Sequence, residues 1–342
     1  MTRPLTDSGE SRKRALVACF CALVFALLPI ATSAQNNLLF FKAQAVAGYY
    51  DHSETWEYYS HHPHHAMQKP SLGIDFISRI GGKTRDIGYF ALQARLAYDQ
   101  SESNNVQPQL YNAFFNWKAP IADVWIGHNK TALGLSSYLD NHALLLIDNS
   151  MSGLNFDRDW GAGINYDGDL LDVSFSATTG SGMPLYVGEN NLFAARVGLG
   201  DLSSHNATVG ISGATGKILK SMGYNVMHNN KKHELLLGGI DASWRYLGME
   251  VATDVLYGEY DTDPAYAALG RLGFFLLPEE RLKLDLQGHF TELKGYAEQF
   301  YSAGLSIRVI PDLTLRSVYT LHYPGENYSI ALQAYFYKGI VF

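Results

Sequence analysis

The chain has almost no cysteine. Its 342 residues contain two, Cys19 and Cys21, and both lie in an amino-terminal segment with basic residues at 12–14, an apolar run over 15–30 and small residues up to Ala34. That order predicts a secretory signal peptide over residues 1–34. The remaining part, 35–342, then has no cysteine, so no disulfide and no cysteine-based zinc site are expected there. Residues 16–19 also fit a lipoprotein cleavage pattern, but the apolar run follows Cys19 instead of preceding it.

Long apolar runs and excess positive charge are also missing. After Ile30 no apolar run approaches the ~20 residues that a membrane-spanning helix needs. The net charge is −7, and the predicted signal peptide holds four basic residues against two acidic ones, so the mature chain is more acidic still. This balance disfavours binding to nucleic acid, which needs a basic face. A membrane protein without spanning helices has to be a closed β-barrel, because lipid cannot hydrogen-bond to an open sheet edge.

Short segments of alternating apolar and polar residues fill the rest of the sequence. Most have about the 9–11 residues that a tilted spanning strand requires. We count sixteen of them, near residues 40–50, 71–81, 87–98, 108–118, 123–131, 159–167, 170–179, 192–200, 206–215, 233–245, 249–259, 265–276, 281–292, 298–309, 313–323 and 327–341. The pattern predicts an all-β, antiparallel transmembrane barrel of about 16 strands in one domain, 35–342. Counts of 14 or 18 stay open, and a soluble β-sandwich is the competing fold.

The connections support the barrel. Alternate connections are short and most contain Gly, Pro or Asp, as tight turns do. The others include the long segments 51–70, 132–158, 180–191 and 216–232. Short periplasmic turns and longer extracellular loops are typical of outer-membrane barrels. We therefore predict the outer membrane of a Gram-negative bacterium as the location, with membrane lipid and the barrel assembly machinery as partners.

The last strand, 327–341, supports the same location. Its apolar face is interrupted by Lys338, which lies near enough to the end to extend its amine to the interface. The chain stops on Phe342, and a last strand that ends on Phe resembles the assembly signal of bacterial outer-membrane barrels.

Charged side chains fall on the opposite faces of these strands. A charge on the lipid face costs ~2–4 kcal/mol at the midplane, so these residues are expected to face a water-filled lumen. The predicted pore-lining residues are Arg79, Arg95, Arg196, Arg245, Arg271, Arg281, Lys283, Arg308 and Arg316. A sixteen-stranded barrel is wide enough for an aqueous channel, and the basic excess mildly favours anions. Alternatively, Arg and Asp on neighbouring strands pair only to brace the wall.

The connection 132–158 contains an apolar stretch, residues 144–147, among polar residues. It suits a loop that folds into the barrel and narrows it, with Asp140 and Asp148 near the constriction. Alternatively, the loop only caps the mouth.

Histidines gather in the first long connection, at positions 52, 61, 62, 64 and 65. Imidazoles bind Zn, Cu or Ni, but a histidine-rich tract is only compositional evidence, so we predict no metal site and no cofactor.

Two motifs in segment 114–200 carry a family resemblance. One strand ends in Trp125-Ile126-Gly127-His128-Asn129-Lys130 with Gly134 after it, and the next begins Arg158-Asp159-Trp160-Gly161. Ala177-Thr178-Thr179-Gly180 closes the strand that follows. These residues resemble the phosphate-selective porin O and P family, although His128, Ala132 and Leu133 depart from its pattern. The resemblance implies a trimeric sixteen-stranded porin that draws anions through with basic side chains.

Three functions compete at this stage. The favoured one is a porin for passive diffusion of small polar or anionic solutes. A second is a barrel that encloses a partner such as an electron-transfer cytochrome, which predicts an open lumen with no inward loop. A third is an outer-membrane hydrolase. No G-x-S-x-G motif occurs, and no Ser is tied by spacing to the inward candidates His289 and His322, so we predict that the protein is not an enzyme.

Overall fold

The computed structural model describes ten stretches of the chain. They are residues 37–51, 53–58, 69–81, 86–99, 105–137, 145–200, 206–222, 224–227, 230–325 and 327–341. The predicted signal peptide, the histidine tract, Asp140 and Phe342 lie outside them.

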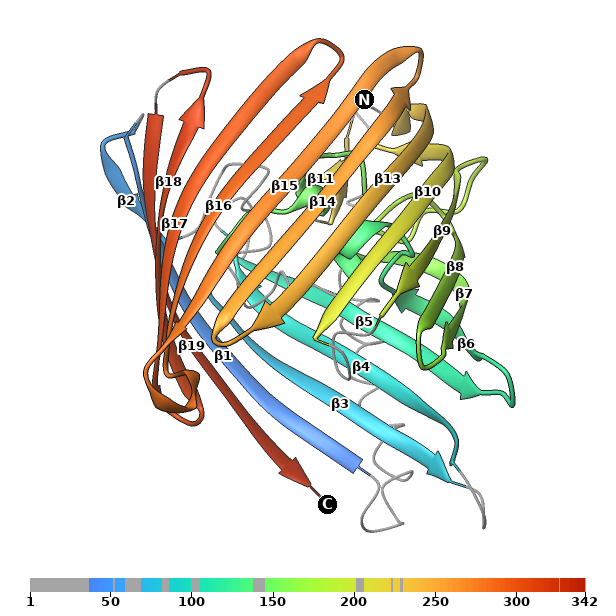
Figure 1. The fold of residues 1–342 in the computed structure, drawn as a ribbon, viewed down its shortest axis with the longest axis horizontal. Coiled ribbons are helices and arrows are strands. Elements are labelled where there is room, and N and C mark those ends of the chain that lie inside the picture. Colours follow the sequence, from blue (N-terminus) through green and yellow to red (C-terminus); the bar gives the residue numbers. More distant parts are fainter. Residues whose placement is uncertain are drawn as a thin grey trace, which may run out of the picture.

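Sixteen antiparallel strands form one closed barrel (Figure 1). β1 pairs with β19 from Leu38↔Val341 to Tyr50↔Ser329, which leaves the wall without a free edge. The prediction of sixteen strands is confirmed. The wall strands are β1 (Asn37–Tyr50), β3 (Ser71–Gly81), β4 (Asp86–Tyr98), β5 (Val106–Lys118), β6 (Asp123–Asn129), β7 (Asp159–Asp167), β8 (Leu171–Thr178), β9 (Asn191–Leu199), β10 (Ala207–Leu219), β13 (Lys232–Tyr246), β14 (Met249–Tyr260), β15 (Asp263–Leu276), β16 (Leu282–Leu293), β17 (Tyr296–Ile310), β18 (Leu313–Tyr323) and β19 (Asn327–Val341).

Six short elements lie in the described parts of the connections. β2 (Thr55–Glu57) pairs with the extracellular end of β1, and β11 (Ser221–Met222) pairs with β12 (Asn225–Val226) in a separate hairpin. The other three are 3₁₀ turns: η3 (Gly134–Ser137), η4 (Asn149–Met151) and η6 (Pro278–Glu280). Within the described stretches, no helix has the length and apolar character needed to cross a membrane.

Side chains alternate between the two faces of the wall, as the sequence predicts. On β8, for example, Phe175 is 43 % exposed on the outside while its neighbour Ser176 is buried on the inside. Aromatic residues near the periplasmic ends of the strands, including Trp117, Tyr166 and Trp244, are exposed on the outer surface. They fit a girdle at the level of the lipid headgroups. Lys338 is also exposed, and its Nζ lies 3.3 Å from an Asp312 carboxylate oxygen in the turn before β18.

Candidate pore constriction

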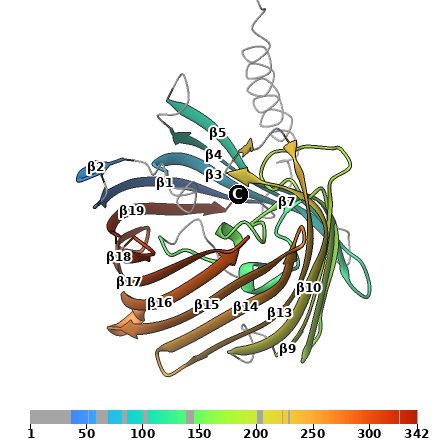
Figure 2. The same ribbon diagram turned by 90° about the horizontal axis from the view of Figure 1, so that it is seen from above.

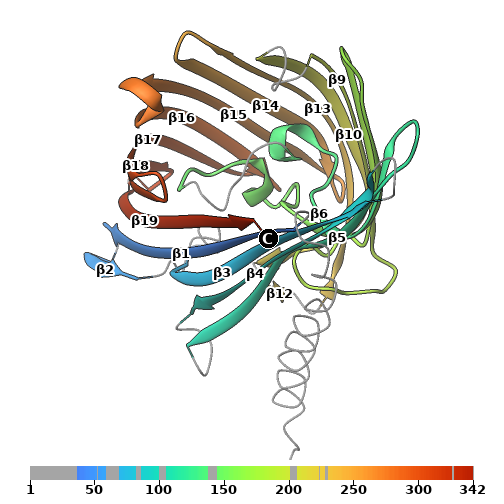
Figure 3. The same ribbon diagram turned by 90° about the horizontal axis from the view of Figure 1, so that it is seen from below.

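The long connection between β6 and β7 runs inside the barrel. Both end-on views place the green segment that follows β6 within the ring of strands (Figure 2; Figure 3). Its apolar side chains pack on the inner wall: Leu133 and Leu154 join a cluster with residues of β9–β15, and Leu145 and Leu146 contact Val46 and Val318. Burial of these leucines supplies the driving force for the inward course. An empty sheath for a partner protein is therefore not what the described residues form.

Polar contacts fix the same segment to β14 and β16. The Leu135 N–H donates to Oδ2 of Asp254 (3.1 Å), and the Gln287 amide donates to the Ile147 carbonyl (2.6 Å). Asn149 donates to the backbone carbonyl of Asp254 (3.1 Å). Gly134 adopts φ +59°, and a Cβ at this position would lie 2.5 Å from Asp254 Oδ2. Only glycine allows the loop to approach this closely with such a backbone conformation.

Asp148 lies in this loop, but its side chain does not face an open constriction. It is 1 % exposed, and its carboxylate accepts from the backbone N–H (2.8 Å) and hydroxyl (2.6 Å) of Ser150, which caps η4. Asp148 therefore helps to shape the inward loop, and its predicted role near the constriction stays a prediction. The other predicted loop acid, Asp140, falls outside the described residues.

Burial raises the pKa of the Asp148 carboxyl, in opposition to the Ser150 hydrogen bonds and the nearby Arg271, which lower it. A raised folded-state pKa favours the protonated acid, so the folded loop is penalised as the pH rises above the ordinary carboxyl pKa of about 3.9. We expect Asp148→Asn to stabilise the barrel relative to wild type at pH 7. The difference should shrink as the pH approaches 4. Urea midpoints of both proteins across this range, followed by tryptophan fluorescence, measure it; a difference that grows toward acid pH contradicts the sign.

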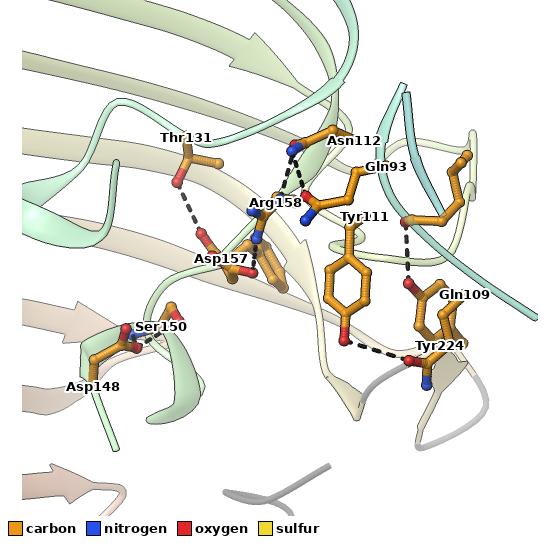
Figure 4. A network of polar contacts seen from close by, with 12 residues as sticks. Gln93, Gln109, Tyr111, Asn112, Thr131, Asp148, Ser150, Asp157, Arg158 and Tyr224 are labelled. Carbon is orange, nitrogen blue, oxygen red and sulfur yellow. Dashed lines mark hydrogen bonds and ion pairs between the residues drawn. The ribbon is translucent and has the colours of Figure 1, made fainter. Parts of the chain in front are cut away.

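A β-bulge on β5 positions Tyr111, whose ring has cationic side chains around it. The pairing of β4 with β5 shifts between Gln93↔Asn112 and Ala94↔Leu110, which leaves Tyr111 as the extra residue. A bulge redirects side chains, and here both Tyr111 and Asn112 face the interior. Tyr111 is fully buried, and three cations surround its ring: Arg95 at 4.3 Å, Arg158 at 5.5 Å and Lys42 at 5.8 Å from the centroid. Figure 4 shows Arg158 and Tyr111 in the surrounding polar network.

The cluster continues to a second tyrosine. Tyr335 lies on β19, between β1 and β18. The amine of Lys42 on β1 lies 5.4 Å from the Tyr335 ring centroid, and the guanidinium of Arg316 on β18 lies 5.1 Å from the same centroid. Cations above aromatic faces are attracted to the ring quadrupole. Lys42, Arg95, Arg158 and Arg316, which we call the cationic cluster, are thus linked through two rings on one side of the lumen.

Three of the predicted pore-lining arginines share one arrangement: each is paired with a glutamine directly across the strands. Arg95 donates to Gln109 (2.6 Å), Arg271 to Gln287 (2.8 Å) and Arg316 to Gln333 (2.8 Å). A glutamine carbonyl accepts a hydrogen bond without carrying charge. Unlike a carboxylate, it orients the guanidinium without neutralising it.

The remaining predicted cations are placed differently. Arg196 has no exposed surface and is paired with Asp241 (2.6 Å) and Asp172 (3.0 Å), so it braces the wall and is not available to solutes. Lys283 lies 3.0 Å from Asp285 and 3.3 Å from Glu250. The others lie at the periplasmic end: Arg79 is exposed near the end of β3, Arg245 pairs with Glu280, Arg281 pairs with Glu279, and Arg308 contacts the Glu279 carbonyl.

Two members of the cationic cluster, Lys42 and Arg158, are absent from the sequence-based set. Lys42 lies on the polar phase of its strand together with Gln44, so the alternation itself could have identified it. Arg158 precedes β7 in the inward loop, where strand periodicity gives no signal. It hydrogen-bonds to Asn112 (2.9 Å) and pairs with Asp157.

Asp159, the residue that follows Arg158, has a structural role that accounts for the Arg-Asp pair in the sequence motif. The Asp159 carboxylate is fully buried and accepts from the Thr179 hydroxyl (2.8 Å) and from the backbone N–H groups of Gly180 (2.5 Å) and Gly182 (3.1 Å). These bonds tie the start of β7 to the segment after β8. They fix the backbone from which Arg158 projects toward Tyr111.

The two inward histidines contact residues other than serine. His289 lies 3.2 Å from the Asn149 side-chain oxygen, and His322 lies 3.2 Å from a Glu298 carboxylate oxygen. Among the described residues, no group of three or more His, Cys, Asp or Glu is arranged to hold a metal ion.

Comparisons with known proteins identify the fold. The chain is similar to OmpT of Vibrio cholerae with loop L8 deleted, an outer-membrane protein (TM-score 0.64, 11 % identity, covering 90 % of this chain and 100 % of that one). It is also similar to OmpF of Salmonella typhi (0.64, 11 %, 89 % and 98 %) and to an anion-selective porin from Comamonas acidovorans (0.60, 9 %, 89 % and 98 %). The fold is that of the outer-membrane porin barrels. No protein-family model and no curated protein matches the sequence, so the likeness to phosphate-selective porins rests on its short motifs.

Proposed function

We propose that the protein is a porin of the outer membrane, a water-filled channel through which small polar solutes diffuse with a preference for anions. The observation that carries the proposal is the cationic cluster. Arg95 and Arg316 project from the inner face of the wall and each donates to a glutamine, whereas the predicted pore-lining cations that pair with carboxylates, such as Arg196 and Arg245, lie in the periplasmic half of the wall. Fixed positive charge in a lumen attracts anions and repels cations.

The inward loop supports the same function. A segment that crosses the lumen, with polar bonds to Asp254 and Gln287 and apolar contacts to Val46 and Val318, reduces the open section of the barrel. In the cationic cluster, Lys42, Arg95 and Arg316 lie on β1, β4 and β18, and Arg158 belongs to the inward segment itself. Lys42, Arg95 and Arg158 are largely buried beside this narrowed section, so their charge acts on passing solutes at short range, where the interaction is less screened than in an open mouth. One similar structure, OmpT of Vibrio cholerae, is described as a trimer form. We propose that this chain also forms a trimer.

Recordings from planar bilayers test the channel directly. With purified, folded protein and a salt gradient, we expect stable ohmic steps and a reversal potential biased toward the anion. A barrel that is folded, as judged by slower gel migration after boiling, and that still gives no conductance contradicts the channel. A cation-biased reversal potential contradicts the anion preference alone.

A further inference from the structure

A recess of about 190 Å³ lies in the inner wall beside the root of the inward loop, away from the cationic cluster. Residues of three neighbouring strands and of the loop line it, among them Trp125, Asn129, Lys130, Asn165, Asp172 and Ser174. They lie on the inner face, because the intervening residues Ile126, Ile164 and Phe175 are exposed on the outside. The volume is far larger than a single water needs and smaller than a pocket for a drug-sized ligand.

The walls of the recess are preformed. Trp125 is 2 % exposed and lies against β7, where a Cβ on Gly163 would come within 2.4 Å of the indole nitrogen. At the loop root, the Ala132 N–H donates to the Ser176 hydroxyl (3.1 Å) and the Thr131 hydroxyl donates to the Phe156 carbonyl (3.0 Å). A site built on strands and tied by such bonds holds its geometry without a ligand.

Asp172 is fixed from the other side. Arg196 binds one of its carboxylate oxygens (3.0 Å) and is itself held by Asp241. The wall-bracing cluster described above therefore also sets the orientation of one lining carboxylate.

The lining has little net charge and many hydrogen-bonding groups. Lys130 stands against Asp167 and Asp172, and Asp172 is paired with Arg196 behind the lining, so the recess does not favour an anion. Asn129 and Asn165 each offer a carbonyl and an amide, and Ser174 offers a hydroxyl that both donates and accepts. A neutral molecule with several hydroxyl groups satisfies such a mixture, and the Trp125 indole provides an apolar surface for its carbon skeleton.

We propose that this recess binds a neutral polyhydroxylated solute of monosaccharide size and retains it on its way through the barrel. The transport role rests on the proposed channel function, whereas binding itself does not. The site concerns uncharged solutes, and it is separate from the residues that we assign to anion preference.

Titration of the detergent-folded barrel with D-glucose tests binding without transport. We expect saturable binding by calorimetry and a change in tryptophan fluorescence that Trp125→Phe removes. Asn165→Ala should weaken binding by about fivefold, as for the loss of one ordinary hydrogen bond. The matched control is Thr320→Ala, an inward, buried residue on β18 that bonds to Ser302 (2.9 Å) and should leave binding unchanged.

Planar bilayers provide the second readout. In a conducting barrel, glucose should reduce the current more than glycerol at equal viscosity, and Asn165→Ala should remove the excess. Glucose that acts no differently from glycerol and gives no calorimetric signal overturns the recess while leaving the channel intact. Glucose binding to a barrel that does not conduct supports the recess and overturns the channel. Stronger binding of glycine than of glucose overturns the ligand class.

Discussion

Replacing Arg95 and Arg316 together by glutamate is expected to change the pore from anion-preferring to cation-preferring. Each exchange removes a positive charge that a neutral glutamine holds toward the lumen and adds a negative one. A single charge at ~4 Å contributes ~1 kcal/mol even in bulk water, and ~1.4 kcal/mol corresponds to tenfold. The anion-to-cation permeability ratio should therefore fall by about tenfold or more. Reversal potentials in a salt gradient measure it.

A matched control comes from the periplasmic end. Replacing Arg281 and Arg308 by glutamate makes the same change in formal charge, but both residues are exposed there beside Glu279. Water and salt screen exposed charges beyond ~10 Å at 0.1 M ionic strength. We expect a clearly smaller shift. Equal shifts for the two double variants would mean that net charge alone, and not the cationic cluster, sets the preference.

The second large effect concerns the stability of the wall. Asp241→Ala removes one of the two carboxylates that pair with the fully buried Arg196 among the described residues, and Asp172 is the other. Removing one member of a buried ion pair typically costs ~3–5 kcal/mol, because the other charge stays buried without compensation. We expect a loss near the lower end of that range, since Asp172 remains. Guanidinium unfolding followed by tryptophan fluorescence measures the change.

An exposed ion pair gives the comparison. Glu280→Ala removes the partner of Arg245 at the periplasmic end, where both side chains are roughly half exposed. Such pairs contribute ~0–1 kcal/mol. A double variant, Arg196→Met with Asp241→Leu, should recover most of the loss, since it removes both charges. If Asp241→Ala unfolds at the same denaturant concentration as Glu280→Ala, the bracing role of Arg196 is wrong.

The strands could be predicted because each carries its own signal. Alternation with period two identifies both faces, and turn residues mark the ends, so segments such as 71–81, 159–167 and 313–323 match the observed β3, β7 and β18 residue for residue. The position of Lys338 near the end of the last strand follows from the same alternation, and the structure shows it exposed there. A local periodic signal does not depend on where the rest of the chain goes.

The constriction could be predicted only in part, because it depends on contacts between distant segments. The apolar residues at 144–147 predict burial inside the barrel. They give no sign that the Asp148 side chain turns back to cap η4. The basic positions of the strands were identifiable, but not their partners: Arg95 and Arg196 look alike in sequence, and only the cross-strand register gives one a glutamine and the other two carboxylates. Arg158 reaches the pore through the path of a loop, which has no period.

The bulge at Tyr111 decides which face of the extracellular half of β5 meets water. Gln107 and Gln109 face the interior because the bulge places two consecutive residues, Tyr111 and Asn112, on the inner face. If β5 kept its length but paired without the bulge, strict alternation would turn both amides toward lipid and bring Val106 and Pro108 into the water-filled interior. Most substitutions along this strand change individual contacts, whereas loss of the bulge would exchange the lipid-facing and water-facing residues of half the strand.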